Sequence, residues 1–495
     1  MTPTRLNAVV RKLPGVRALV RVVRALPSAD WYLVGGPVRD LLRSPRSEAG
    51  GASVNDVDIV VTKTPLAVLE RTLRKHGKVN LVGKRFGVLK FTPRGKTEAI
   101  DIALPRTDHY DRATGKYRDV RTQSDPRLSI EEDLSRRDFT VNAMAVNLRT
   151  GELVDPFRGQ ADLTARRIRA VGDPSKRFRE DESRVLRALR FATLLRGTIE
   201  PKTWIALKRF VPKLKGETVP REVVAKEFVK TFAQSPGAAF DWYERSGAFR
   251  VLLPEIETMK RVPQPRAYHR EGDVFVHTRI AVRLLESPAF KRAFPKTPFT
   301  PQLAVTTLLH DVGKPPTLRT PKKHGVNRIR FDGHADQGAD RARNIAERLK
   351  LASTGMIDVD ALHWAIKHHL IGLRATLDHI KETTFAKYFL NPATPGDLLL
   401  QLIWADGGAT VPEGKRANRG SYTRIRQRIA AVRKRLGTKQ SLPPPLLNGT
   451  EVMQLRHIPS GPFVGQILQA LREEQLAGRI RKKSAARAFV EQFRG

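Results

Sequence analysis

The sequence of 495 residues contains no cysteine, which excludes disulfide bonds, thiolate zinc sites and cysteine nucleophiles. It has no apolar run long enough to cross a membrane. Its basic N-terminus lacks the apolar core and the small-residue cleavage site of a secretory signal. We therefore expect a cytoplasmic protein without a membrane partner.

Acidic residues are scarce beside basic ones. The chain has 50 Asp and Glu against 90 Lys and Arg, a formal net charge of +40. A generally basic proteome contributes to this excess. The remaining excess of positive charge predicts a polyanion partner. Residues 415–439 carry many basic residues and no acid, which fits a helix that contacts RNA phosphates or one that is simply solvated.

The first stretch that suggests chemistry runs from Trp31 to Thr62. An apolar run ends in Gly35 and Gly36, whose backbone N–H groups we expect to face a triphosphate near a helix N-terminus. Asp56 and Asp58 lie two apart on a predicted strand, so their side chains share one face. Adjacent carboxylates repel each other unless a cation lies between them, and Mg²⁺ prefers oxygen ligands. An exposed strand edge is the alternative.

Two further groups of polar residues follow. Asp101 lies on a predicted strand, either as a third carboxylate facing the metal or as a strand-edge residue. Arg136 and Arg137 supply forked donors for phosphate oxygens, unless they only pair with the acids at residues 131–133. Asp138 can orient one of these arginines, and Asn142 offers a donor and an acceptor to a ribose hydroxyl.

Helical patterns begin near residue 162 and include the segment 178–191. On a helix, Asp181 and Arg184 are three apart and therefore neighbours, and an internal salt bridge is the plain interpretation. Arg187 and Arg190 continue the same face and could hold a triphosphate or an RNA backbone.

A second constellation lies beyond the rigid linker at residues 262–265. Apolar helical runs lead to His-Asp or Ala-Asp pairs, an arrangement that can present imidazole and carboxylate ligands inside a helical bundle. The candidate ligands are His277, His310, Asp311, His334, the pair His368-His369, and Asp406.

The motifs of the N-terminal half resemble those of the class II template-independent nucleotidyltransferases, which comprise tRNA CCA-adding enzymes and bacterial poly(A) polymerases. GGPVRD with DVDIVVT resembles the catalytic signature, although residues 44–54 lengthen the usual spacing. RRDFTVNA resembles the ribose- and phosphate-binding motif, and EDESR the base-reading motif, in which an Asp and an Arg read cytosine or adenine.

This resemblance implies two-metal phosphoryl transfer from CTP and ATP to the 3′ end of a tRNA, with no DNA partner. The implied catalytic residues, which bind Mg²⁺, are Asp56 and Asp58, with Asp101 as a third. The implied nucleotide-binding residues are Gly35, Gly36, Arg39, Arg137, Asp138, Asn142, Asp181, Arg184, Arg187 and Arg190.

The histidine-rich half resembles the HD phosphohydrolase domain. This resemblance assigns the metal ligands to His277, His310, Asp311 and Asp406, with His334 and His368 completing a second position. Mn, Ni, Fe or Mg would suit such ligands and would activate water for attack on a phosphoester, with Lys314 near the phosphate. Fused HD domains occur in some CCA-adding enzymes.

The expected fold is α+β: a small sheet head, an all-α neck, a helical HD domain and a helical tail. We predict limits at residues 1–30 for a basic helix, 31–160 for the head, 161–262 for the neck, 263–412 for the HD domain and 413–495 for the tail. The favoured function is CCA addition. A poly(A) polymerase, a CC-only or A-only enzyme, a protein that acts mainly as an HD phosphodiesterase, and a non-catalytic RNA-binding module remain alternatives.

Overall fold

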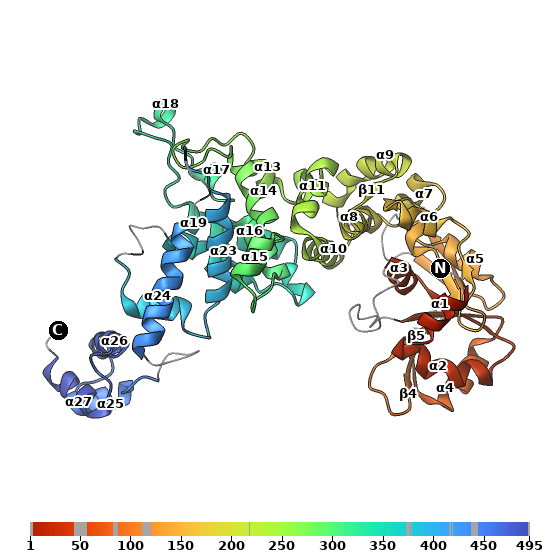
Figure 1. Cartoon of the computed structure of the whole chain (residues 1–495), viewed down its shortest axis with the longest axis horizontal. Coiled ribbons are helices and arrows are strands. Elements are labelled where there is room, and N and C mark those ends of the chain that lie inside the picture. Colours follow the sequence, from red (N-terminus) through yellow and green to blue (C-terminus); the bar gives the residue numbers. More distant parts are fainter. Residues whose placement is uncertain are drawn as a thin grey trace. The chain divides into compact units, whose positions relative to one another are not determined.

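The computed structural model describes residues 3–43, 57–82, 88–110, 120–216, 218–372, 377, 379–414, 417, 419–436 and 444–493. The chain forms two compact units (Figure 1). The first comprises Met1–Gln234 and Trp242–Leu252, and the second Ser235–Asp241 and Leu253–Gly495. The α+β fold class expected from the sequence is confirmed: a mixed sheet in the first unit is followed by helices.

The sheet of the first unit has seven strands in the order β3-β4-β5-β2-β1-β8-β9. These are β1 (Asp30–Val34), β2 (Asp58–Thr62), β3 (Gly77–Val82), β4 (Val88–Pro93), β5 (Ile100–Ala103), β8 (Ala145–Asn147) and β9 (Leu153–Val154). Only β2 and β5 pair in parallel. The central strand β2 reads DIVVT and is buried from Ile59 to Thr62, as a strand covered on both faces requires.

Helices and two small sheets complete the head. Its helices are α1 (Pro3–Val10), α2 (Pro14–Ala25), α3 (Gly36–Arg43), α4 (Leu66–Arg74), α5 (Ile130–Ser135) and α6 (Gly159–Thr164). The small sheets pair β6 (Arg106–Tyr110) with β7 (Val120–Ser124), and β10 (Arg167–Ile168) with β11 (Thr198–Ile199). Helix α4 packs against β3 and α2 (Figure 1).

The neck consists of helices that pack around large aromatic side chains. They are α7 (Pro174–Glu180), α8 (Ser183–Leu195), α9 (Pro201–Phe210), α10 (Arg221–Gln234), α11 (Pro236–Ser246) and α12 (Ala248–Leu252). Helix α8 packs along α10, and Phe228, Phe232 and Tyr243 stack in a fully buried cluster. This cluster joins α10 to α11, and α10 in turn supports α8, which carries Arg184, Arg187 and Arg190.

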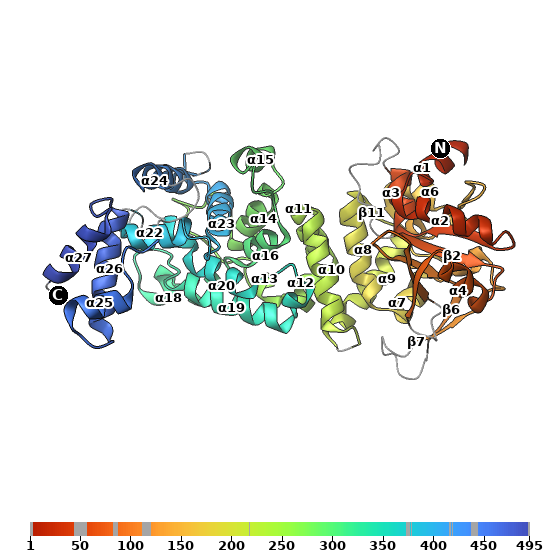
Figure 2. The ribbon, with the colours of Figure 1, turned by 90° about the horizontal axis from the view of Figure 1, so that it is seen from below.

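The second unit is helical. It contains α13 (Pro254–Glu257), α14 (Val274–Leu284), α15 (Pro288–Ala293), α16 (Pro301–Leu309), α17 (Lys314–Thr317), α18 (Pro321–His324), α19 (His334–Arg348), α20 (Val359–His368), α22 (Glu382–Phe389), α23 (Gly396–Ala409) and α24 (Gly420–Leu436). The apolar helix α16 packs against α14, α20 and α23 (Figure 2), and these helices carry most of the predicted HD ligands.

Three helices form the C-terminal part of this unit: α25 (Gly449–Arg456), α26 (Pro462–Leu476) and α27 (Lys483–Gln492) (Figure 2). They share a core of their own around Val452, Ile467 and Val490. Helices α26 and α27 lie within the predicted helical tail and are separated after Leu476. Among the described helices, none combines the length and apolar character needed to cross a lipid bilayer.

Candidate functional site

A cavity of about 930 Å³ in the first unit brings together the described members of the predicted nucleotide site. They are Gly35, Gly36, Arg39, Asp58, Asp101, Arg137, Asp138, Asn142, Asp181, Arg184, Arg187 and Arg190. These residues come from strands β1, β2 and β5, from helices α3 and α8, and from the connections around them. Asp56 lies outside the described residues.

The two described carboxylates of the predicted metal site lie on adjacent strands. Asp58 begins β2 and is aligned with Asp101 in the parallel pairing of β2 with β5, so their side chains point to the same face of the sheet. The Lys90 Nζ atom lies 3.7 Å from Asp101 Oδ1 and offsets part of its charge. Neighbouring carboxylate oxygens at the edge of a cavity fit a hard cation such as Mg²⁺.

Gly35 has a different role from the one that the sequence suggested. Its N–H group donates to the Met144 carbonyl oxygen at 3.2 Å, so the expectation that it faces a triphosphate is wrong. Gly35 instead has φ +75°, and a Cβ atom there would lie 2.6 Å from Arg137 Nη1. The missing side chain therefore makes room for the guanidinium of Arg137 at the cavity wall.

Asp133 orients the arginines of the RRD motif. It is fully buried, and its oxygens lie 2.8 Å from Arg136 Nη2 and 3.4 Å from Arg137 Nη2. The alternative that these arginines pair with neighbouring acids therefore describes part of what they do. Arg106, which sequence reasoning did not select, also lines the cavity, and its backbone N–H donates to Asp133. Its isolated position in the sequence gave no signal of this.

A continuous chain of polar side chains runs along one wall of the cavity. Arg39 donates from Nη1 to Asn142 Oδ1 at 2.7 Å, and Asn142 donates from Nδ2 to Asp138 Oδ1 at 3.1 Å. Arg187 then donates from Nε to Asp138 Oδ2 at 2.8 Å. Asp138 also accepts the Phe139 N–H group. Contacts within the protein thus hold Asp138 and Asn142 in place without a nucleotide.

The chain continues from α8 to α10 through a buried carboxylate. Glu227 Oε2 accepts a hydrogen bond from Arg190 Nε at 2.6 Å, and Glu227 Oε1 lies 3.6 Å from Arg187 Nη1. The guanidiniums of Arg39, Arg187 and Arg190 also lie over the Phe191 ring, at 5.0, 5.3 and 4.2 Å from its centroid. These arginines are therefore positioned by acids and by an aromatic face.

Burial alone would raise the pKa of Asp138, but the charge of Arg187 and hydrogen bonds from Asn142 and Arg187 outweigh it. The pKa of Asp138 is consequently lowered to about 2. The neighbouring Asp138 charge raises the pKa of Arg187 in turn. Both groups are charged at neutral pH and stabilise each other.

Asp181 and Arg184 share the cavity, but not through the helical spacing that the sequence suggested. Asp181 ends α7 with φ −152° and ψ 102°, and α8 begins only at Ser183. Its Oδ1 accepts the Ser183 N–H at 2.9 Å, which stabilises this break. Arg184 Nε lies 4.0 Å from Asp181 Oδ2, whereas Arg184 Nη1 pairs with Glu180 at 3.0 Å.

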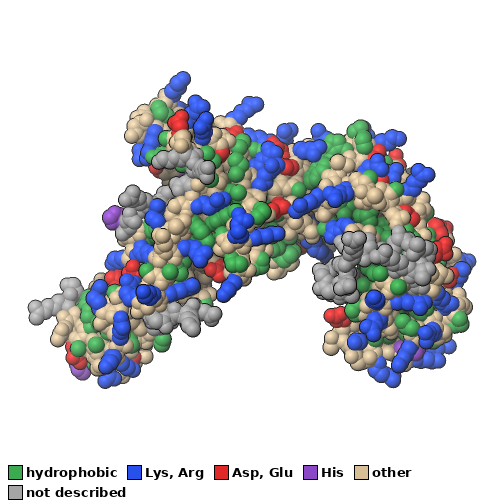
Figure 3. All heavy atoms as spheres, viewed as in Figure 1, with side chains coloured by type: hydrophobic (Ala, Val, Ile, Leu, Met, Phe, Trp, Pro, Cys, Tyr) green, Lys and Arg blue, Asp and Glu red, His purple; other side chains and the backbone are tan. Residues whose placement is uncertain are grey.

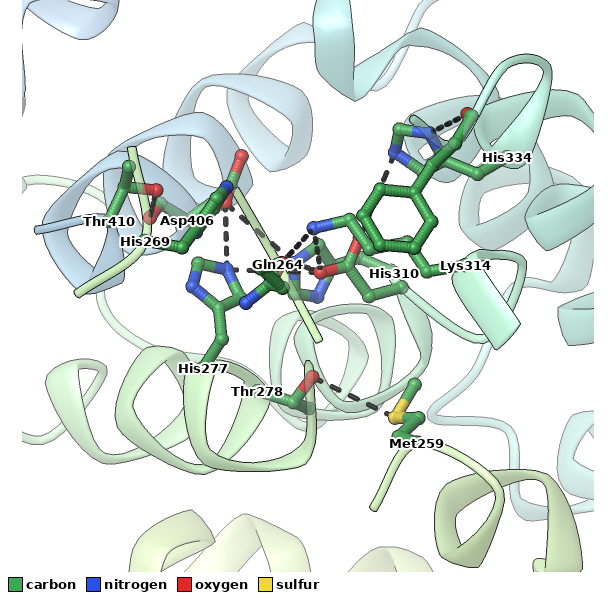
Figure 4. Close-up of polar contacts among 12 residues, drawn as sticks. Met259, Gln264, His269, His277, Thr278, His310, Lys314, His334, Asp406 and Thr410 are labelled. Carbon is green, nitrogen blue, oxygen red and sulfur yellow. Dashed lines mark hydrogen bonds and ion pairs between the residues drawn. The ribbon is translucent and has the colours of Figure 1, made fainter. Parts of the chain in front are cut away.

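In the second unit, the four predicted HD ligands converge (Figure 4). His277 Nε2 lies 3.0 Å from Asp406 Oδ1, and His310 Nε2 lies 3.3 Å from Asp311 Oδ2. His277 Nε2 also lies 3.9 Å from Asp311 Oδ2, and His310 Nε2 lies 3.9 Å from Asp406 Oδ1. The histidines and Asp311 are almost fully buried, and each side chain comes from α14, α23 or the C-terminal end of α16.

His369, and not His368, lies beside this cluster. His369, His334 and Asp311 place ligand atoms within 4.8 Å of one another. The His369 ring also lies 5.7 Å from that of His310. His368 instead packs against Trp364 and Tyr388, so assigning it to the second metal position was wrong. Consecutive histidines point in different directions, and their spacing alone offers no basis for choosing between them.

Buried polar atoms test whether these residues fit a metal. His310 Nε2, His334 Nε2 and Asp311 Oδ1 have no hydrogen-bond partner within the described part of the chain. Burial lowers the pKa of His310, and burial together with the charge on His369 lowers that of His334 to about 4. Burial opposes ionisation of Asp311, but nearby His310 and Lys314 hold its pKa well below its usual range. Neutral imidazoles beside a carboxylate are the donors that divalent transition metals prefer.

Lys314 lies next to the cluster with its charge already paired. Its Nζ atom lies 2.7 Å from Asp311 Oδ2 and donates to Gln264 Oε1 at 2.9 Å. The same ammonium lies 5.6 Å from the centroid of the Phe331 ring. Lys314 thus offsets the carboxylate charge of the cluster and is close enough to meet a phosphate there.

Basic side chains are abundant on the face shown in Figure 3. Residues 420–436 form the helix α24 that the basic segment predicted. Arg428 and Arg435 of this helix pair with Glu382, and Arg428 also donates to the carbonyl oxygens of Leu377 and Ile380. Part of its charge therefore holds the fold together, and contact with RNA stays a prediction.

Replacing Gly35 with Ala should weaken nucleotide binding. The methyl group would displace Arg137, and the left-handed backbone is strained for alanine. We expect CTP to bind at least about tenfold more weakly, a loss of about 1.4 kcal/mol, as measured by calorimetry. Gly36→Ala is the matched comparison, because its Cβ atom would lie 3.6 Å from Arg39 Nη2, an ordinary contact. A larger loss in Gly36→Ala would contradict this explanation.

Replacing Asp138 with Asn should lower stability in a pH-dependent way. The pKa of about 2 lies below the ordinary value of 3.8, so the carboxylate stabilises the folded state above about pH 4 and loses this effect as the pH falls through about 2. Its contribution at neutral pH is about 2 kcal/mol. The difference in unfolding free energy between the two proteins, from urea titrations, should be constant from about pH 5 to pH 8 and shrink at lower pH. A difference that grows toward acid pH would refute this assignment.

Comparison with known proteins agrees with this arrangement. Residues 31–169 match the family described as the poly A polymerase head domain, and residues 277–403 match the HD domain. An A-adding tRNA nucleotidyltransferase from Deinococcus radiodurans is 34% identical over 370 residues, covering 74% of this chain and 80% of the relative. A multifunctional CCA protein from Halorhodospira halophila is 35% identical over 326 residues, covering 65% of this chain and 69% of the relative.

Solved structures share the fold. A CCA-adding enzyme from Bacillus stearothermophilus in complex with CTP aligns with a TM-score of 0.60 and 22% identity, over 96% of this chain and 97% of that chain. The Thermotoga maritima CCA-adding enzyme complexed with tRNA aligns with a TM-score of 0.59 and 20% identity, over 99% and 98% of the two chains. With its head motifs in one cavity and an HD domain later in the sequence, this chain belongs to the family of the tRNA nucleotidyltransferases and poly(A) polymerases.

Proposed function

We propose that this protein adds C, C and A to the 3′ end of tRNA, using CTP and ATP without a nucleic-acid template. The observation that carries the proposal is the joint placement of Asp58, Asp101, Asp181 and Arg184 in one cavity. Its relatives named multifunctional CCA proteins support the choice of product. Work on tRNA would place the protein in the cytoplasm.

The carboxylates would hold the metal. Asp58 and Asp101, together with Asp56, would bind Mg²⁺. The bound ion would stabilise the charge that develops on the phosphates. Arg137 faces the same cavity beside Gly35, and its guanidinium suits the oxygens of the triphosphate. Arg39 already donates hydrogen bonds to Asn142 and Asp40. Its main effect would be to hold Asn142 in position to bind a ribose hydroxyl.

Base selection would rest on Asp181 and Arg184. The bases of CTP and ATP both carry an exocyclic amine that can donate a hydrogen bond to a carboxylate. UTP and GTP lack an amine at the corresponding edge of the base. Asp181 lines the cavity, and its Oδ1 accepts the Ser183 N–H group at the start of α8. Arg184 is fixed by Glu180 and by the carbonyl oxygens of Arg177 and Arg136. The protein itself would therefore serve as the template for each base.

A second proposed activity belongs to the HD cluster. His277, His310, Asp311 and Asp406 would hold a divalent metal, either a transition metal such as Mn, Ni or Fe, or Mg²⁺, and His334 and His369 would offer a second position. Such a metal supplies activation of water toward a phosphoester. Lys314 would orient the phosphate from beside Asp311. The unpartnered nitrogen atoms of His310 and His334 favour this second function.

Addition of A alone is the alternative product, because the Deinococcus radiodurans relative carries that name and is matched over 80% of its length. A tRNA transcript that ends before CCA, incubated with CTP, ATP or both, distinguishes the possibilities by its 3′ sequence. We expect a stop at CCA, and loss of addition by at least about a thousandfold in Asp58→Ala. Addition of A only to a transcript ending in CC, or a long A tail, would replace the proposed product. Full activity in a folded Asp58→Ala protein would overturn the mechanism.

The two activities should separate by mutation. Asp311→Ala removes a ligand of the HD cluster, which lies in the other compact unit from Asp58. We expect this variant to lose metal-dependent hydrolysis of a 2′,3′-cyclic phosphate and to keep nucleotide addition. Asp58→Ala should show the reverse. Hydrolysis that survives in Asp311→Ala would show that the cluster has no catalytic role.

A further inference from the structure

A buried carboxylate behind the HD cluster contacts one of its ligands. Glu271 lies in the connection that precedes α14, and its side chain is 2% exposed. Its Oε1 atom lies 2.8 Å from His277 Nδ1 and 2.7 Å from His269 Nδ1. Its Oε2 atom accepts the Val411 N–H group at 2.9 Å.

These contacts determine which nitrogen of His277 faces the cluster. Oε1 lies between two imidazole nitrogens and Oε2 accepts a backbone N–H group, so the carboxylate is the acceptor in these contacts and Nδ1 of His277 carries a hydrogen atom. The opposite nitrogen, Nε2, then points to Asp406 at 3.0 Å (Figure 4). The ring is fully buried and is held from both ends, so Glu271 fixes both its tautomer and its orientation.

The same carboxylate connects the two helices that supply this part of the cluster. His277 is on α14, whereas Asp406 is on α23, which ends at Ala409. Glu271 reaches the backbone of Val411 just beyond that end. It therefore restrains the separation of His277 and Asp406 in addition to the rotation of the imidazole.

We propose that Glu271 is the positioning residue of the HD cluster, one that presents His277 Nε2 to a divalent cation. This inference rests on the proposed metal binding of that cluster. Carboxylates that orient a ligating histidine typically raise metal affinity by 10- to 100-fold.

His269 provides a matched comparison. It donates to the same oxygen as His277, its ring lies 5.3 Å from the His277 ring, and its side chain is 16% exposed. The contact from Glu271 to His277 does not require it. These three residues also place ligand atoms within 4.8 Å of one another, and we assign their contacts to hydrogen bonding because His277 Nε2 faces the main cluster.

The test is a calorimetric titration of the full chain with Ni²⁺ after removal of metals by a chelator. We expect Glu271→Ala to bind Ni²⁺ about 10- to 100-fold more weakly than the unchanged protein. Glu271→Gln should lose less, because its amide oxygen still accepts the Nδ1 hydrogen. His269→Ala should bind within about threefold of the unchanged protein. Bound Co²⁺ should show a shifted visible spectrum in Glu271→Ala, and thermal unfolding without metal checks that each variant folds.

The outcomes separate the two proposals. If the unchanged protein does not bind Ni²⁺, Mn²⁺ or Co²⁺, the proposed metal function of the cluster fails, and the positioning role fails with it. If it binds but Glu271→Ala binds within threefold with an unchanged Co²⁺ spectrum, only the positioning role fails. Equal losses in His269→Ala and Glu271→Ala would also overturn that role, because they would assign the effect to the connection as a whole. If Glu271→Ala does not fold, the Ni²⁺ affinities of Glu271→Gln and His269→Ala are compared instead. A weaker affinity in Glu271→Gln supports the positioning role, and equal affinities overturn it.

Discussion

The nucleotide cavity depends on the pairing of Asp138 with Arg187. Each of these groups would be costly to bury alone, and each is stabilised by the other at 2.6 Å. Through Asn142 the pair reaches Arg39 on α3, and through Glu227 it reaches Arg190 and the neck helix α10. Helix α3 of the head and helices α8 and α10 of the neck are thus joined by buried charges that offset one another.

The two sites use opposite ways of preparing polar groups. In the nucleotide cavity, each arginine forms an ion pair with a buried acid. The pairing offsets the arginine's charge and holds its planar N–H donors in a fixed position. In the HD cluster, burial keeps most of the imidazoles neutral, so that nitrogen lone pairs are available. His277 is the exception, because hydrogen bonds with Asp406 and Glu271 outweigh burial and raise its pKa to about 9, so a cation that binds Nε2 would displace a proton from it.

Much of this organisation was predictable from the sequence, because the chemistry is concentrated in short motifs. The strand that carries Asp58 and the basic helix α24 followed from local spacing. The convergence of His277, His310, Asp311 and Asp406 followed from the resemblance to the HD domain. The alignment of Asp58 with Asp101 required strand pairing across the sheet, which spacing along the chain does not reveal.

The failures share a physical cause. The hydrogen bond from Ser183 to Asp181 interrupts a segment whose composition is helical throughout, and a single side chain decides the break. The choice of His369 over His368 depends on the direction in which α20 ends. Arg106 gave no signal, because its partner Asp133 lies on another segment of the chain. Glu271 lies only six residues before His277, but its contact with Val411 depends on how distant segments fold together.

The arginines of this chain fall into two electrostatic environments. Those at the surface are separated from a bound polyanion by water and mobile ions, which at physiological ionic strength screen charge beyond about 8 Å. Arg39 and Arg190 are mostly shielded from solvent and lie against Phe191 and buried acids. Ionic strength therefore acts unequally on the two proposed substrates: added salt loosens the grip on a long RNA much more than the hold on a single nucleotide within the cavity.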